Sequence, residues 1–139
     1  MEQWEKASCC LRKKMELLEK IAVNTEAQYR FIHRREMKGL KRVFGEREIL
    51  IRKLVAINLE LSKDQTWKNI QRLAPLIQEI SHKGQEIIDR SHQAMQEAIA
   101  ERTRIAAELK SSRVRQQVKN QYINPWAIVA HGRRFNEKG

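Results

Sequence analysis

The sequence contains one arrangement of residues that could bind a metal ion. His82 follows Glu79 by three positions, and His92 follows Asp89 by three positions. In di-iron helical bundles, carboxylate-x-x-His pairs of this kind project inward from two different helices. Here both pairs lie on one predicted helix, ten residues apart, which is about 15 Å at a rise of about 1.5 Å per residue. We therefore interpret all four as polar surface residues and predict no metal site and no cofactor.

Nucleophilic chemistry has equally little support. Cys9 and Cys10 are adjacent, so they do not form an ordinary disulfide framework, and no local arrangement marks either as an activated thiolate. The sequence has no Gly-rich phosphate loop, no Gly-x-Ser-x-Gly and no His-Glu-x-x-His. We expect Cys10, next to Leu11, to be a small hydrophobic residue at the edge of the core. We expect that the protein is not an enzyme.

The basic charge is the next candidate for a function. The chain has 28 Lys and Arg residues against 17 Asp and Glu, a net charge of +11. Residues 110–134 and 30–53 each carry a net charge of +6, which could neutralise phosphates, and Tyr122 and Trp126 could stack on exposed bases. Because both blocks are spread around their predicted helices, we favour a solvated surface. A basic helical nucleic-acid-binding or structural protein stays as the alternative.

The composition predicts the elements that must position these residues. Only five glycines and two prolines occur in 139 residues, about 5% where average usage is roughly 12%, which argues against a turn-rich β-sandwich or barrel. No window approaches the roughly 18 uncharged apolar residues of a membrane span, and the acidic start is no secretory signal. We expect an all-α, cytoplasmic protein.

The spacing of apolar residues predicts two helices in the first half of the chain. A 4-3-4-3 pattern runs from Trp4 to Ile32. A second stripe contains Leu40, Phe44, Arg47, Ile51, Leu54, Asn58 and Leu61, flanked by Val43, Leu50 and Ile57. The region 49–57 is apolar over a wide arc, as in a helix with two neighbours. We place the break between His33 and Gly39, with one helix over 2–61 as the alternative.

A third helix follows a break at 62–66, where several residues could cap its start. Its stripe includes Ile70, Ala74, Ile77, Ser81, Gly84, Ile88, Ser91, Met95, Ala98, Ile105 and Leu109. Pro75 predicts a kink or a restart, and the helix is expected to fray between Leu109 and Tyr122. Small residues in its middle would let another helix approach closely. We predict three long antiparallel helices over 1–121 and a tail over 122–139, with a short helix after Asn124-Pro125.

The middle of the chain carries a family resemblance. The run from Lys38 to Leu54, KGLKRVFGEREILIRKL, together with the long helix from Leu76 to Leu109 and the tail ending RFNEKG, resembles the FlgN family. These are small cytosolic export chaperones for flagellar hook–filament junction proteins. The resemblance implies a non-catalytic protein that binds the amphipathic terminal helices of its cargo and prevents premature assembly before type III export.

The same resemblance implies a partner-binding surface on the third helix and the tail. The partners would be flagellar hook-associated proteins and the export apparatus, and a homodimer is an open possibility. Arg113 and Arg115 could steer an acidic cargo segment. The candidate binding residues are Leu76, Ile77, Ile80, Gly84, Ile87, Ile88, Met95, Ile99, Ile105, Leu109, Arg113, Arg115, Tyr122, Trp126 and Ile128.

Overall fold

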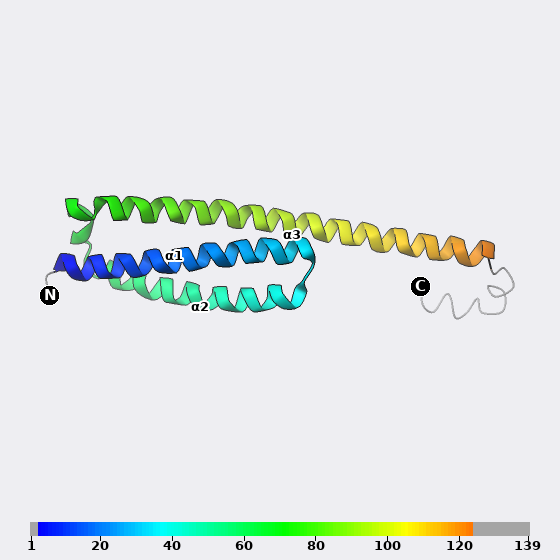
Figure 1. The fold of residues 1–139 in the computed structure, drawn as a ribbon, viewed down its shortest axis with the longest axis horizontal. Helices are drawn as coiled ribbons and strands as arrows, with labels where there is room; N and C mark the ends of the chain where they lie inside the picture. The colour runs from blue at the N-terminus through cyan, green and yellow to red at the C-terminus, as the bar shows by residue number, and fades with distance from the viewer. Residues whose placement is uncertain (1–2, 124–139) are drawn as a thin grey trace. The chain divides into compact units, whose positions relative to one another are not determined.

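A computed structural model describes residues 3–123 of the protein. Three long helices occur, α1 (Gln3–Arg34), α2 (Met37–Ser62) and α3 (Ala74–Ile123), with two short 3-10 turns at Thr66–Asn69 and Gln71–Leu73. No strand occurs in this described part, so the all-α prediction is confirmed. The described part of the chain forms two compact units, which divide between Ile99 and Ala100. In the first unit, α1, α2 and the first half of α3 lie side by side (Figure 1).

The turn between α1 and α2 confirms the predicted break, and the alternative of one helix over 2–61 is wrong. Arg35 has a φ of 58°, its N–H donates to Ile32 O at 3.1 Å, and Glu36 N–H donates to Phe31 O at 2.9 Å. This pair of bonds is a Schellman motif with arginine in the left-handed position that glycine usually occupies. Because glycine is absent there, the sequence marks the boundary poorly.

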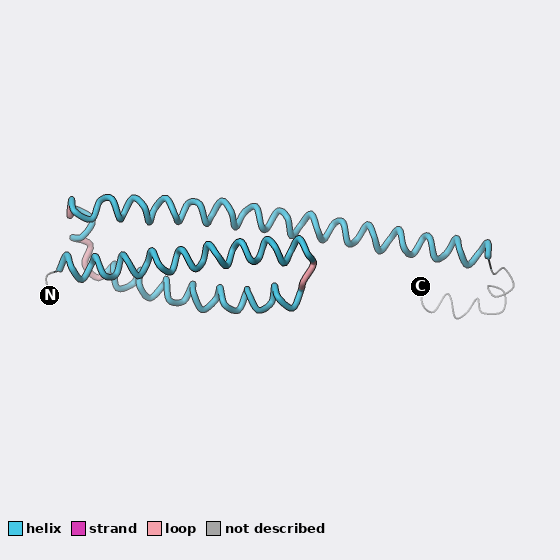
Figure 2. The backbone as a smooth tube through the Cα atoms, viewed as in Figure 1, coloured by secondary structure: helices cyan, strands magenta, loops and turns pink. Residues whose placement is uncertain are grey.

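The connection between α2 and α3 is ordered by side-chain hydrogen bonds. The Asp64 carboxylate accepts from Thr66 N–H at 3.0 Å, and the Trp67 indole donates to Leu61 O at 2.9 Å. Figure 2 shows the loop segments that join α1 to α2 and α2 to α3. Helix α3 begins at Ala74, which places Pro75 in its first turn. A first-turn residue has no intrahelical partner for its N–H, so proline costs little there. The predicted restart at Pro75 is confirmed.

The core of the first unit is contributed by all three helices. Its buried residues are Ala7, Leu11, Leu18 and Ile21 of α1, Leu61 of α2, Leu73 of the connection, and Ile80 and Ile87 of α3. Helix α1 has the widest buried arc, since Leu17, Asn24 and Gln28 are buried beside the predicted stripe. Cys10 packs at the edge of this core, as predicted.

The predicted stripes of α2 and α3 coincide with the core only in part. Leu40, Leu54 and Leu61 of the predicted α2 stripe pack in the two core clusters, but other members are displaced from the core by one residue. On α2, Val43, Leu50 and Ile57 face the core, whereas Phe44 and Asn58 are exposed. The wide apolar arc expected at 49–57 is not buried, because Ile49, Ile51 and Val55 are 54%, 39% and 60% exposed. Both faces of α2 are apolar, and period alone does not distinguish the one that packs inward.

Helix α3 shows the same rotation. Its buried residues in the first unit, Ile80, Ile87 and Ala94, follow Leu73 at intervals of seven, the spacing of helices that pack at a shallow angle. The predicted Ile88 and Met95 lie one position further along and are exposed. The helix also continues to Ile123, beyond the region where fraying was expected.

Arg47 connects the three helices through a polar layer within this core. Its guanidinium donates to Thr25 Oγ1 of α1 at 2.7 Å and to Ser91 Oγ of α3 at 3.1 Å. Thr25 is fully buried, and its hydroxyl donates to Ile21 O at 2.9 Å. Burial lowers the pKa of the Arg47 guanidinium, which nevertheless remains charged at neutral pH.

Two buried amides extend the layer. Asn24 Nδ2 donates to Val43 O of α2 at 2.9 Å, and Gln28 Nε2 donates to Asn24 Oδ1 at 2.9 Å. Among the described residues, every fully buried side-chain nitrogen or oxygen has a hydrogen-bond partner. Unsatisfied buried polar groups cost about 1–3 kcal/mol each, so sliding one helix past another is disfavoured.

We predict that Thr25→Val lowers the free energy of unfolding by about 1–3 kcal/mol, because it leaves a guanidinium N–H of Arg47 without its acceptor. Thr25→Ser should cost less, since the hydroxyl remains. In an Arg47→Met background, Thr25→Val should be nearly neutral. Urea denaturation of the four combinations measures these differences. Equal costs of Thr25→Val in both backgrounds would contradict the proposed coupling.

A second prediction concerns the α1–α2 turn. A Cβ added at Gly39 would lie 2.8 Å from Phe31 Cε1, whereas a Cβ at Gly45, also in α2, meets nothing within 4 Å. Gly45→Ala should therefore stabilise the protein by about 0.5–1 kcal/mol through helix propensity. Gly39→Ala should destabilise it by about 1 kcal/mol or more through overpacking.

Thermal unfolding of the two glycine variants provides the comparison. Phe31→Leu should relieve the cost of Gly39→Ala by removing the crowded ring. If Gly39→Ala and Gly45→Ala raise the stability equally, the close packing at the turn is refuted.

Candidate partner-binding surface

Several predicted binding residues of α3 belong to the core. Ile80 and Ile87 are 7% and 8% exposed and pack in the main cluster, with Leu76 and Ile77 half-buried against it. Packing within the bundle therefore explains Ile80 and Ile87, and contact of these two residues with a partner stays a prediction.

Other predicted residues are accessible. Ile88, Met95 and Ile99 are 63%, 60% and 50% exposed. In the second unit, Ile105, Leu109, Arg113 and Arg115 are also exposed. Trp126, Ile128 and the side chain of Tyr122 lie outside the described residues.

The small residues of α3 divide between two roles. Ala94 is buried with Ile32 and Leu40, and Ala98 packs against them. Gly84 is different, because a Cβ added there meets nothing within 4 Å. The expected close approach of another helix is thus absent at Gly84, and the surface there has room for a side chain.

Sequence reasoning assigned two residues of α2 to the core that belong to the surface. Phe44 is 50% exposed and Ile51 is 39% exposed. Val55, one turn after Ile51, is 60% exposed. The exposed Phe44 directly follows the core residue Val43, and the exposed Ile88 directly follows the core residue Ile87. Each exposed residue therefore lies about 100° further around its helix than the core residue before it. Since α2 and α3 run in opposite directions (Figure 1), these rotations carry both exposed stripes to the same face.

The Arg47–Ser91 hydrogen bond gives the register of the two stripes. Phe44 precedes Arg47 by three residues and Met95 follows Ser91 by four, so antiparallel helices place Phe44 and Met95 at one level. By the same reasoning Ile51 is level with Ile88. We define the α2–α3 apolar face as Phe44, Ile51, Val55, Ile88 and Met95. The signal that could have located it is the presence of two apolar stripes on each helix, of which only one can be core.

The α1–α3 side of the bundle is closed by polar contacts. The Arg90 guanidinium donates to both carboxylate oxygens of Glu26, at 2.6 and 3.0 Å, and lies 4.2 Å from the centroid of the Tyr29 ring. His33 Nδ1 is 3.5 Å from Glu97 Oε1. The hydrogen bond from Arg90 holds the pKa of the Glu26 carboxyl below its ordinary value. An apolar helix gains little by docking on this side.

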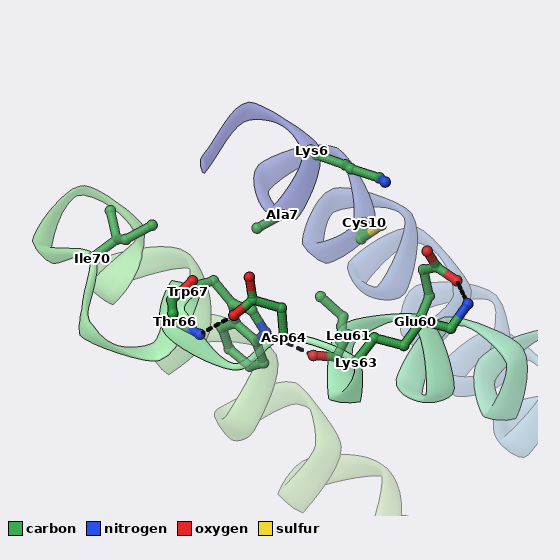
Figure 3. A pocket seen from close by; sticks show the side chains of 10 residues that line it. All are labelled: Lys6, Ala7, Cys10, Glu60, Leu61, Lys63, Asp64, Thr66, Trp67 and Ile70. Atoms are coloured by element: carbon green, nitrogen blue, oxygen red, sulfur yellow. Dashed lines mark hydrogen bonds and ion pairs between the residues drawn. The ribbon is translucent and has the colours of Figure 1, made fainter. Parts of the chain in front are cut away.

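A small pocket of about 160 Å³ lies where α1 begins and α2 ends. Figure 3 shows Trp67 beneath it, with Cys10 and Leu61 in the wall. Lys63 pairs with Glu60 at 3.0 Å, and Asp64 accepts from Thr66. Small-molecule sites are usually about 300–1,000 Å³ with converging free polar groups, so this pocket fits the packing of the bundle end better than a ligand.

The described residues contain neither a metal-binding cluster nor a helix that could span a membrane. No group of three or more His, Cys, Asp or Glu residues in this part of the chain could hold a metal ion. Among the helices described, none combines the length and apolar character needed to cross a membrane.

We predict that the Glu26–Arg90 pair contributes stability only above acidic pH. Because the folded pKa of Glu26 is depressed, its contribution is present above the ordinary carboxyl pKa of roughly 4.3 and is lost as the pH falls through the folded value. Glu26→Gln should cost about 0.5 kcal/mol at pH 7, a value typical of partly exposed pairs, and nearly nothing at pH 2. Denaturation in an Arg90→Gln background is the control, where the pH-dependent difference should vanish.

The comparisons with known proteins add no family to this geometry: no family model, no curated protein and no solved structure matches the chain.

Proposed function

We propose that this protein is a non-catalytic, cytosolic chaperone of the FlgN type. In this role it binds the amphipathic terminal helices of flagellar hook–filament junction proteins and keeps them from assembling before type III export. The single observation that supports this function best is the α2–α3 apolar face. Its large side chains are 39–63% exposed, although the core beside them is well packed.

The face has the form that an amphipathic helix requires. Phe44 and Ile51 are seven residues apart, as are Ile88 and Met95, and antiparallel helices carrying such repeats accept side chains of a further helix between them. The space beside Gly84 could receive one of those side chains. A helix laid on this face would complete a four-helix arrangement, the usual mode of helix-in-groove recognition.

The face overlaps in part with the surface that the resemblance implies, because Ile88 and Met95 belong to α3 and the other residues of the face belong to α2. The segment Lys38–Leu54 that carries the resemblance lies in α2 and includes Phe44 and Ile51. The exposed Arg113 and Arg115 of α3 could accelerate encounter with an acidic cargo segment, and this effect should weaken with salt. The affinity itself would come mainly from apolar burial.

We predict that labelled peptides of the terminal helices of hook–filament junction proteins bind the full-length chain, measured by fluorescence anisotropy at about 150 mM salt. Met95→Gln and Ile51→Gln should each weaken binding about tenfold, since burying such a side chain contributes about 1.5–3 kcal/mol. Val23→Gln is the matched control, because Val23 is 68% exposed on α1, away from this face. It should change the affinity less than twofold.

The same measurement with duplex DNA and single-stranded RNA tests the alternative. Nucleic-acid binding that falls steeply between about 50 and 200 mM salt, together with no binding of any junction-protein helix, would refute the chaperone proposal. The net charge of +11 would then be the functional feature.

A further inference from the structure

A second apolar groove lies between α1 and α2. It encloses about 650 Å³ and is lined by Glu16, Glu19, Lys20, Val23, Asn24, Ala27, Glu46, Ile49 and Leu50. Its floor is apolar, and Val23 and Ile49 are 68% and 54% exposed. The α2–α3 apolar face uses none of these residues, so the two surfaces are separate.

The rim of this groove has the opposite charge to the chain as a whole. Three glutamates and one lysine line it, although the protein carries a net charge of +11. Some carboxylates elsewhere in the first unit pair with cations, as in Glu26–Arg90, Glu48–Arg52 and Glu60–Lys63. Within the described residues, Glu16, Glu19 and Glu46 have no cation within 4.0 Å.

The unpaired carboxylates occupy both walls at nearby levels. Asn24 of α1 bonds to Val43 O of α2, and the two helices are antiparallel (Figure 1). Three residues further along α2, Glu46 is therefore level with Ile21, between Glu19 and Val23. A ligand lying along the groove would have negative charge on both sides and an apolar floor beneath it.

We propose that the α1–α2 groove binds a basic amphipathic α-helix of a partner protein, with an apolar stripe flanked by Lys and Arg. The α1 side of the groove extends over twelve residues from Glu16 to Ala27, about 17 Å or three helical turns. Leu and Ile side chains would cover Val23, Ala27 and Ile49, and flanking cations would reach the three glutamates.

The rim disfavours the other classes of ligand. Phosphates of a nucleic acid and the flanks of an acidic helix would meet three carboxylates. The groove is open, and its one buried polar side chain, Asn24, already bonds to Val43 O and Gln28, so no free polar group is buried there for a small molecule. The charges are solvated, so each ion pair would contribute modestly, and together they would act on both encounter rate and partner choice.

Two designed peptides test the proposal. Both have 18 residues with leucine at alternating spacings of three and four, and one carries lysine on the flanks where the other carries glutamate. Anisotropy with the full-length chain at about 50 mM salt should give at least tenfold tighter binding of the lysine peptide. Raising the salt to about 300 mM should reduce that preference. Equal binding of the two peptides would overturn the proposal.

A matched pair of triple variants locates the site. Glu16→Gln, Glu19→Gln and Glu46→Gln together should weaken binding of the lysine peptide about tenfold, because three modest exposed ion pairs are lost at once. Glu5→Gln, Glu36→Gln and Glu79→Gln change the net charge equally at sites outside the groove and should have less than a twofold effect. Equal losses of affinity in both triple variants would show that overall charge causes the binding. That result would overturn the assignment of the site to the groove.

Two further variants separate this site from the α2–α3 apolar face. Val23→Gln should weaken the lysine peptide severalfold, and Met95→Gln should leave it unchanged. The reverse result would overturn the assignment here without affecting the chaperone proposal. Light scattering of the free protein tests whether a second copy of this chain occupies the groove. If the protein is a dimer and the lysine peptide dissociates it, the partner is a second copy of this chain. That result would overturn the proposal of a different protein.

Discussion

The Arg47 guanidinium is the contact on which the arrangement of all three helices depends. It needs acceptors in a largely apolar interior, and it finds them in Thr25 of α1 and Ser91 of α3. Apolar contacts alone would tolerate several alignments of neighbouring helices, because leucine and isoleucine side chains are similar in shape. The polar layer removes that freedom, since any other alignment leaves a buried donor unsatisfied.

Once this register is established, the three sides of the bundle acquire different characters. The α1–α3 side is closed by Arg90, Glu26 and Tyr29. The α2–α3 side has two parallel stripes of exposed apolar residues, and the α1–α2 side has an apolar groove with unpaired carboxylates. Under the two proposals above, each exposed apolar surface of the unit would bind a further helix, and the carboxylates of the α1–α2 groove would favour a basic one.

Residue spacing predicted only part of which apolar residues are exposed at the candidate site. Ile88, Met95 and Ile99 were predicted as contact residues and are exposed, whereas Ile80 and Ile87 of the same prediction are core. Phe44 and Ile51 were assigned to the core of α2 and belong to the surface. In each case the error is one position, because α2 and α3 have apolar residues on two adjacent faces. A helical period identifies both faces but contains no information on which one meets a neighbour.

The sequence by itself determined the all-α class, the three helices and the restart at Pro75, because apolar periodicity, few glycines and a proline act locally. It also predicted Cys10 at the edge of the core. Tertiary structure alone decided the rotation of the α2 and α3 stripes and the gathering of Glu16, Glu19 and Glu46 around one groove. These features depend on contacts between residues about 20 to 65 positions apart, such as Asn24 with Val43 and Arg90 with Glu26. Local propensity does not encode such contacts, since burial and hydrogen-bond satisfaction are settled only when the helices pack.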